Sequence, residues 1–261
     1  MFSWHRVFTF GVVVTLAEIS SLVAAPPSFR VDTDIFVGDS AKPARQNITL
    51  FHQGVCFDFA SDDSLAVMIV DAGQGRITLL DPHRRIKAPI ETAELSRWLT
   101  EARKEAEQSE LAKVLAPATE VKINEQTGAV HVGGPQFSYQ ASLQSPPDAE
   151  MARQYANFAD WSARLSAMYP PHFPPYVRLA LNRAITEKGM LPAELTRTIQ
   201  QNGQSSQVRC RLHPSWQLNS DDHSKIASAQ QMLADFKEVS AKEYFSQPLI
   251  SVRRSDTVGK K

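Results

Sequence analysis

The sequence lacks an excess of charge of either sign. Its 261 residues include 28 Lys and Arg against 28 Asp and Glu, so the formal net charge is zero. A protein that attracts nucleic acid through its overall field needs a clear positive surplus. The charge balance therefore argues against a nucleic-acid partner. Hydrophobic residues at 43% and charged residues at 21% are typical of a soluble globular protein.

The sequence also lacks the short motifs that define many enzyme classes. It contains no G-x-G-x-x-G or Walker A phosphate loop, no G-x-S-x-G nucleophile elbow, no H-E-x-x-H pair and no C-x-x-C pair. A motif-bearing enzyme is therefore disfavoured. We assign no catalytic residue, no metal ligand and no cofactor from the sequence.

The first 25 residues follow the pattern of a secretory signal peptide. An apolar run follows Arg6, and small residues then lead to a cleavage site after Ala25, with Ala24 as the alternative. A retained N-terminal anchor is the other interpretation, but Glu18 leaves an apolar segment shorter than the roughly 20 residues that span a bilayer. We expect an exported protein, periplasmic or extracellular.

Cysteine is scarce, with only Cys56 and Cys210 in the chain. Export to an oxidising compartment permits one disulfide. However, each cysteine lies in a strand-like stretch, and two residues so far apart in the sequence need not meet. The sequence favours two buried free thiols, with a single bridge as the alternative.

Alternation of apolar and polar residues predicts an antiparallel meander in the first part of the mature chain. Short turns with polar or glycine residues separate its strands. The connections between the strands are therefore too short for the helices of βαβ units. The expected strands are 29–37, 47–52, 55–59, 65–70 and 76–81.

Later segments change between helical and strand periodicity. The expected helices are 91–114, 148–168, 176–188 and 220–236, and the expected strands are 119–124, 129–132, 136–143 and a hairpin of 194–200 with 207–213. The Pro- and aromatic-rich segment 169–175 is expected to connect two helices rigidly. Together these elements predict a signal peptide over 1–25, a single α+β domain over 26–245 and a flexible polar tail over 246–261.

The strand at Leu65–Val70 is apolar on both faces. Such a strand must be covered on both sides, by helices on one and by more protein or an apolar ligand on the other. The candidate ligand-binding residues are therefore apolar side chains of this strand and its two neighbours. They are Phe57, Phe59, Val67, Ile69, Ile77 and Leu79.

One group of residues has the composition of a metal site. His213 precedes Asp221, Asp222 and His223, which combine imidazole and carboxylate ligands of the kind zinc uses. Acids at the start of a helix have a simpler explanation as capping residues that favour the helix dipole. We therefore expect no metal here, and we read the acids at 62–63 and Asp81 as turn formers.

The stretch 67–85, VMIVDAGQGRITLLDPHRR, is a strand, a glycine-containing turn and an alternating strand ending in Asp-Pro. With the signal peptide and the later helices, it resembles the periplasmic lipoprotein carriers of the LolA/LolB type. The likeness covers Phe29 to about Arg85 and, more loosely, 118–143 and the later hairpin. It implies a curved antiparallel sheet, half-barrel-like, with helices packed on its concave face, which receives acyl chains. No residue of this sequence matches a functional residue of that family.

These observations lead to a first expectation and two alternatives. The first expectation is an exported, non-enzymatic protein that binds an apolar small molecule or lipid on a LolA-like scaffold. The alternative is a structural or interaction protein of the cell envelope with a filled core and an envelope protein as its partner. The second alternative is an enzyme without a recognisable motif.

Overall fold

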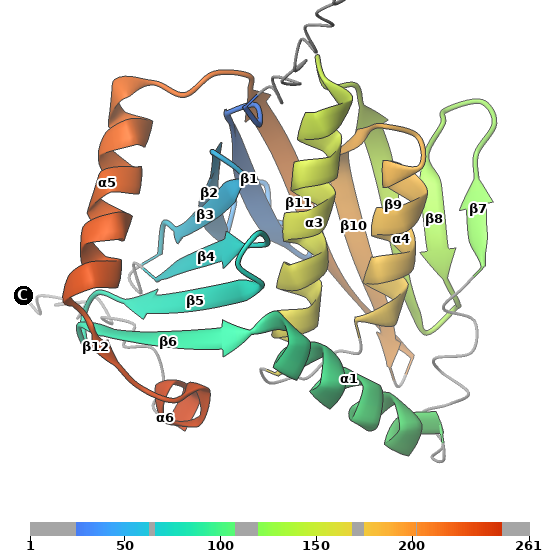
Figure 1. The fold of residues 1–261 in the computed structure, drawn as a ribbon. Coiled ribbons are helices and arrows are strands. Elements are labelled where there is room, and N and C mark those ends of the chain that lie inside the picture. Colours follow the sequence, from blue (N-terminus) through green and yellow to red (C-terminus); the bar gives the residue numbers. More distant parts are fainter. Residues whose placement is uncertain (1–24, 63–65, 108–119, 169–174, 202, 247–261) are drawn as a thin grey trace, which may run out of the picture.

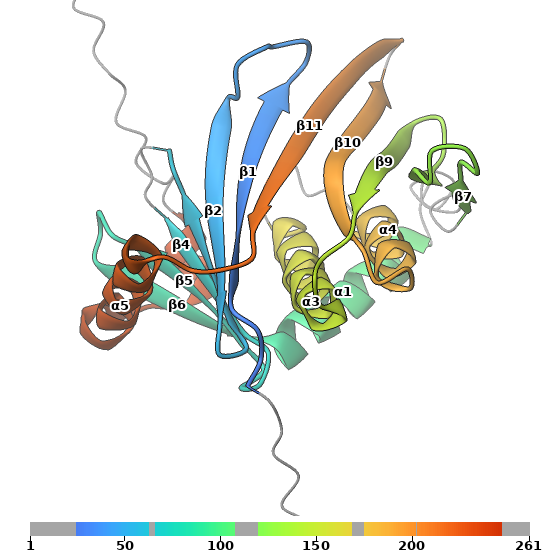
Figure 2. The same cartoon turned by 90° about the horizontal axis from the view of Figure 1, so that it is seen from above.

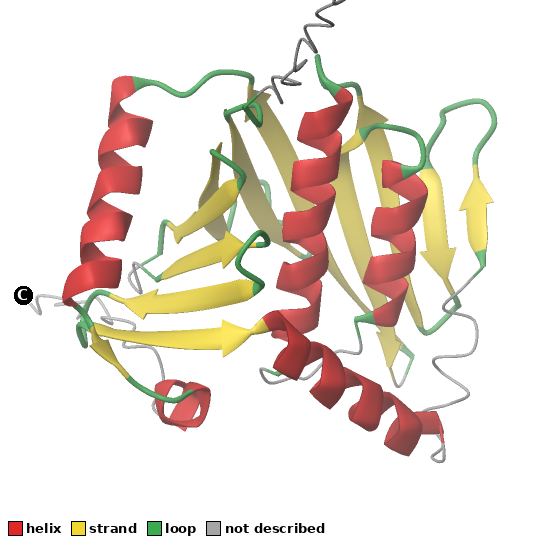
Figure 3. Ribbon diagram, viewed as in Figure 1, coloured by secondary structure: helices red, strands yellow, loops and turns green. Residues whose placement is uncertain are grey.

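The structure is a computed structural model that describes residues 25–62, 66–107, 120–168, 175–201 and 203–246. Within this part the chain forms an open, mostly antiparallel 12-stranded sheet and five helices, which confirms the α+β class (Figures 1 and 3). The predicted signal peptide, apart from Ala25, most of the Pro-rich connection and all but the first residue of the predicted tail lie outside the described residues.

The first half of the sheet is the predicted meander with one further strand. The strands are β1 (Phe29–Val37), β2 (Arg45–His52), β3 (Val55–Ala60), β4 (Val67–Asp71), β5 (Arg76–Asp81) and β6 (Ile86–Glu91). Each pairs antiparallel with the next. The predicted strands are confirmed, although β4 begins at Val67 and residue 65 lies outside the described residues, and β6 is a strand that the sequence pattern does not predict.

Pro89 explains why β6 was missed, because proline inside a run argues against a central strand. In the sheet, β6 lies between β5 and the two-residue strand β12 (Lys237–Glu238), which pairs only with Ile86 and Lys87. The Lys87 carbonyl accepts from Val239 on this outer side. Since backbone groups alternate in direction along a strand, the nitrogen of Pro89 also points outward, where no neighbour needs its missing N–H.

The second half of the sheet is built from five strands. They are β7 (Val121–Ile123), β8 (Val130–Gly133), β9 (Phe137–Gln144), β10 (Leu191–Gln201) and β11 (Gln204–Ser215). The two halves join where β1 pairs antiparallel with β11, with Ile35 opposite Cys210. The predicted strands and hairpin are confirmed, and β10 and β11 extend beyond the predicted hairpin at both ends.

The helices are α1 (Thr92–Glu107), α3 (Ala149–Ser166), α4 (Tyr176–Thr186), α5 (Ser220–Asp235) and α6 (Ala241–Ser246). The first predicted helix, 91–114, begins in the structure directly after β6, and its residues after 107 lie outside the description. α6 was not predicted. No helix in the described part of the chain is long and apolar enough to cross a membrane.

The helices cover the two faces of the sheet unequally. α1, α3 and α6 share one apolar cluster with β1–β6, and α4 packs on β8, β9 and β10 from the same side. α5 packs on the opposite face of β2–β5. Figure 2 shows α5 on one side of the sheet and α3 and α4 on the other, with β1, β2, β10 and β11 extending past α3 and α4.

Candidate functional site

The structure divides the six predicted ligand-binding residues between the two faces of the sheet. Phe57, Val67 and Ile69 are buried beneath α5, and Phe59 packs against the same cluster half-buried. Ile77 and Leu79 are buried on the other face, in the cluster shared with α1 and α3. The six side chains therefore do not line one cavity. Their assignment to a ligand stays a prediction, but their position is that of core residues.

The expectation that the strand around Val67 is covered on both faces is confirmed. Val67 and Ile69 lie in the cluster under α5, whereas Val70 lies in the cluster under α1 and α3, against which Met68 packs half-buried. The covering on each side is protein, supplied by helices.

A row of half-buried side chains crosses the sheet on the face that carries α3 and α4. It runs from β9 to β4 through cross-strand partners and through residues two apart on one strand, which point to the same face. The step from β2 to β3 is the hydrogen bond from Asn47 to Asp58. We call this row of side chains the half-buried row. Its members are Phe137, Ile199, Arg197, Val208, Cys210, Ile35, Thr33, Asn47, Asp58 and Met68.

Asp58 is the carboxylate of the half-buried row. Thr49 Oγ1 donates to its Oδ1 at 2.8 Å, and Asn47 Nδ2 donates to its Oδ2 at 3.1 Å. Burial raises the pKa of Asp58 to about 6, although these hydrogen bonds and the charge of Arg45 act to lower it. Asp58 nevertheless keeps some solvent exposure.

Asp58 should make the protein less stable as the pH rises. Its folded pKa of about 6 exceeds its ordinary value of 3.8, so its contribution is complete below about pH 3.8 and is lost as the pH rises through about 6. Asp58→Asn should remove this part of the slope in the free energy of unfolding, measured by urea titration across that window. Asp39→Asn, at an exposed turn, is the control. A slope unchanged by Asp58→Asn would contradict the assignment.

Tyr155 of α3 and Arg178 of α4 lie beside the row. Arg178 Nε donates to Asn182 Oδ1 at 2.8 Å, and its guanidinium carbon lies 5.8 Å from the centre of the Tyr139 ring. Burial raises the pKa of Tyr155 to about 12, while the charge of Arg178 opposes the rise. The residues around the row thus combine apolar side chains with charges of both signs.

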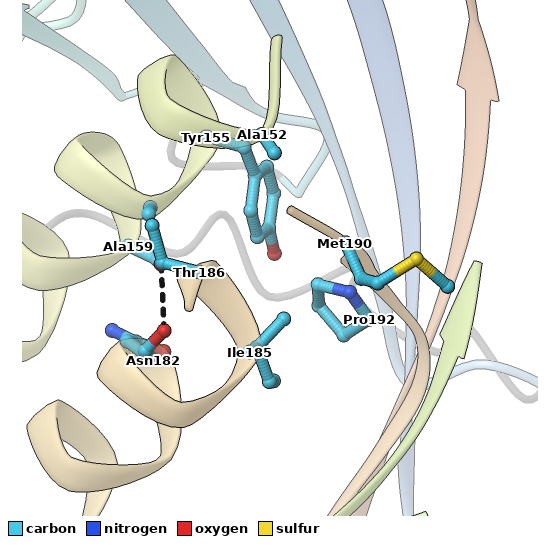
Figure 4. A pocket seen from close by; sticks show the side chains of 9 residues that line it. Ala152, Tyr155, Ala159, Asn182, Ile185, Thr186, Met190 and Pro192 are labelled. Atoms are coloured by element: carbon cyan, nitrogen blue, oxygen red, sulfur yellow. Dashed lines mark hydrogen bonds between the residues drawn. The ribbon is translucent and has the colours of Figure 1, made fainter. Parts of the chain in front are cut away.

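A small pocket lies next to Tyr155, between α3, α4 and the start of β10 (Figure 4). Its volume is about 10 Å³, which is room for about one water molecule. Thr186 Oγ1 donates to the Asn182 carbonyl at 2.7 Å on one wall. The lining residues are Ala152, Tyr155, Ala156, Ala159, Asn182, Ile185, Thr186, Met190 and Pro192. At this size the pocket cannot hold an acyl chain.

The two cysteines are free, as the sequence favoured, although only Cys56 is fully buried. Cys56 lies on β3 and Cys210 on β11, with β1 and β2 between them. Three strand spacings of about 4.8 Å separate these strands, well beyond the roughly 7 Å that a disulfide can span between Cα atoms. Burial raises the pKa of both thiols, which argues against a reactive thiolate.

Thiol labelling should reveal this difference between the cysteines. In the native protein, a thiol reagent should react slowly with half-buried Cys210 and not with Cys56, and urea should release two thiols per chain. The variants Cys56→Ser and Cys210→Ser show which cysteine gives each labelling reaction. Recovery of both thiols only after reduction would contradict the free state.

The residues considered for a metal have other contacts. Asn219 and Asp222 form a capping box at the start of α5, with Asp222 N donating to Asn219 Oδ1 at 2.9 Å and Asn219 N donating to Asp222 Oδ2 at 3.1 Å. The predicted capping role is thus confirmed for Asp222. His213 Nε2 lies 3.4 Å from an oxygen of Asp34, and the ring of His223 packs against His52.

The acids assigned to turns are also partly accounted for. Asp81 Oδ1 accepts from the Arg84 backbone N–H at 2.9 Å, and its Oδ2 accepts from Arg84 Nε at 2.6 Å. Asp62 forms an ion pair with Arg45 at 3.2 Å, and residue 63 lies outside the description. The turn assignment of Asp81 is confirmed.

Sequence reasoning missed the half-buried row as a candidate site. The alternation in 29–37 and 55–59 placed Thr33, Ile35 and Asp58 on defined faces, but Arg197 and Cys210 join them only through the pairing of β1 with β11. A polar residue at an inward strand position, such as Asp58, was the signal that could have pointed to it.

Comparison with known proteins gives no family assignment, since no family profile and no curated protein match the chain. The resemblance to LolA/LolB-type carriers stays a prediction. Conclusions about function therefore depend on the geometry of the sheet and of the half-buried row.

Proposed function

We propose that this is an exported, non-enzymatic protein, periplasmic or extracellular, that binds an apolar small molecule or lipid. In this proposal the sheet curves as a half-barrel with α1, α3 and α4 on its concave face, as the likeness to LolA/LolB-type carriers implies. The ligand lies along the half-buried row. Of the six residues predicted from the sequence, Phe57, Phe59, Val67 and Ile69 lie on the opposite face, under α5, and Ile77 and Leu79 belong to the buried core beside the row.

The observation that carries the proposal is the apolar part of the row. Ile35, Val208 and Ile199 lie on neighbouring strands and are each only half-buried, next to the fully buried clusters beneath α3 and α4. Apolar side chains that lie together on one face of a sheet and stay partly open to solvent are typical of a ligand groove or a contact surface. A ligand chain laid there would extend the existing core.

Binding of 1-decanol tests this function, because the probe has an apolar chain and no charge. The protein purified without detergent should bind 1-decanol in a calorimetric titration. Ile35→Asn should weaken binding by about tenfold, because a polar group replaces apolar contact area worth about 1.4 kcal/mol. Ile48→Asn is the matched control, since Ile48 is also half-buried but packs on the α5 face. Equal effects of the two changes would contradict the assignment of the row.

A structural or interaction protein of the cell envelope is the second candidate. The specific observation in its favour is that helices already cover the six predicted residues and that the pocket beside α3 has a volume of only about 10 Å³. A filled core of this kind needs no ligand. Failure to bind 1-decanol would favour this candidate, with an envelope protein as the partner.

A further inference from the structure

Two arginines lie where the half-buried row passes beneath α4. Arg197 belongs to the row on β10, and Arg178 lies in the first turn of α4. Both charges act on the thiol of Cys210, on the strand next to Arg197, and both lower its pKa against the effect of burial. Tyr139 links the two arginines, because it is the cross-strand partner of Arg197 and its ring centre lies 5.8 Å from the guanidinium carbon of Arg178.

In the described part of the chain, the contacts of Arg178 are with neutral groups. Its Nε donates to Asn182 Oδ1, its guanidinium lies against the Tyr139 ring, and it also interacts with the Tyr155 hydroxyl. The nearest acid in this network is Asp160, which accepts from Asn182 Nδ2 at 2.8 Å and lies 3.4 Å from Arg164. Among the residues that the structure describes, no carboxylate is therefore in direct contact with the charge of Arg178.

The start of α4 adds positive charge at the same place. The helix has no acidic residue in its first turn, and Pro175 at its N-cap supplies no side-chain hydrogen bond. Its N-terminal dipole is thus uncompensated within the described residues and has the same sign as Arg178. A half-buried positive region next to an apolar surface is stabilised by an anion that is bound there.

The opposite charge lies at the other end of the row. Asp58 on β3 is four strands from Arg197 on β10, a separation of about 19 Å at 4.8 Å per strand. Thr49 and Asn47 already satisfy both oxygens of Asp58. A bound anion would be repelled by Asp58 at this end of the row and attracted by the arginines at the other. The charges of the row therefore favour one orientation of an anionic ligand.

We infer that the ligand of the half-buried row is an anionic amphiphile, whose carboxylate or phosphate head pairs with Arg178 and Arg197. This inference rests on the proposed function. The apolar chain of the ligand runs from β10 across Val208 and Ile35 towards β3. The head group, and not the chain, sets the preference among ligands of equal length.

Paired titrations with decanoate and 1-decanol test the head group while keeping the chain length the same. The protein should bind decanoate at least about tenfold more tightly than 1-decanol, which is the effect expected of one charge-assisted contact. Arg178→Gln should abolish this preference by weakening the binding of decanoate much more than that of 1-decanol. The binding of 1-decanol that remains shows that the variant is folded. Arg197→Gln should act in the same direction. Arg183→Gln, on the exposed side of α4, should change neither affinity.

The outcomes separate this inference from the proposed function. Equal binding of decanoate and 1-decanol, unaffected by Arg178→Gln, overturns the inference and leaves the apolar site intact. If the protein binds neither decanoate nor 1-decanol, both the inference and the proposed function are overturned. Acetate and inorganic phosphate serve as head groups without a chain, and binding of either as tight as that of decanoate would show a simple anion site and overturn the amphiphile.

Discussion

Val67→Asp should prevent folding or cost several kcal/mol of stability. Val67 is 4% exposed, faces Phe59 and Leu80 across the neighbouring strands and lies beneath α5. An aspartate there would bury a carboxylate with no positive partner, at a cost of several kcal/mol. This is a large share of the roughly 5–15 kcal/mol that stabilises a domain. Urea and thermal melts of the purified variant measure the loss.

Met68→Asp should be tolerated much better, although Met68 is the next residue. Met68 is half-buried in the row, where water can reach a new carboxylate. The change should instead raise the pKa of Asp58, its cross-strand partner, because the two like charges would face each other. Val37→Asp, at a position 55% exposed, is the neutral control. Equal destabilisation by the first two changes would show that the row is a closed core.

Asp222→Ala should have the second largest effect. Asp222 is 0% exposed, and its Oδ1 accepts from Arg30 at 2.8 Å while the same side chain completes the capping box of α5. Arg30 is 22% exposed and keeps its hydrogen bonds to Asp32, so the lost contact costs about 1.5–3 kcal/mol, as for a hydrogen bond between charged groups. Loss of a helix cap costs about 1 kcal/mol more. The free energy of unfolding should fall accordingly in a urea titration.

Asp221→Ala is the matched control for this change. Asp221 is the preceding residue in the same helical turn, but its side chain is exposed. It should alter stability by less than about 1 kcal/mol, through its interaction with the helix dipole alone. If the two alanine variants unfold at the same urea concentration, the buried pair of Arg30 with Asp222 does not hold α5 on the sheet.

The strands were predictable from sequence because alternation is a local signal. It located β1 to β5 and most of β7 to β11, whereas β6 was hidden by Pro89 and β12 is held only by its pairing with β6. Short elements such as α6 depend on contacts far away in the sequence. Tyr244 of α6, for example, donates to the Leu80 carbonyl and packs against Arg84.

The candidate site was less predictable, because the register between strands decides which side chains share a face. Ile69 pairs with Thr78, so Ile77 and Leu79 share a face with Val70 and Met68 instead. Choosing alternate residues in each strand separately could not reveal this shift. The row itself depends on the pairing of β1 with β11, which no local pattern indicates.

Native mass spectrometry of the chain purified without detergent tests the central claim, that the half-buried row binds an apolar ligand. We expect a bound species of discrete mass, or the uptake of one molecule of added 1-decanol. The bound fraction should be unchanged in Ile48→Asn and clearly lower in Ile35→Asn. A bare chain that takes up no 1-decanol would contradict this claim. Adducts retained equally by both variants would place the ligand away from the row.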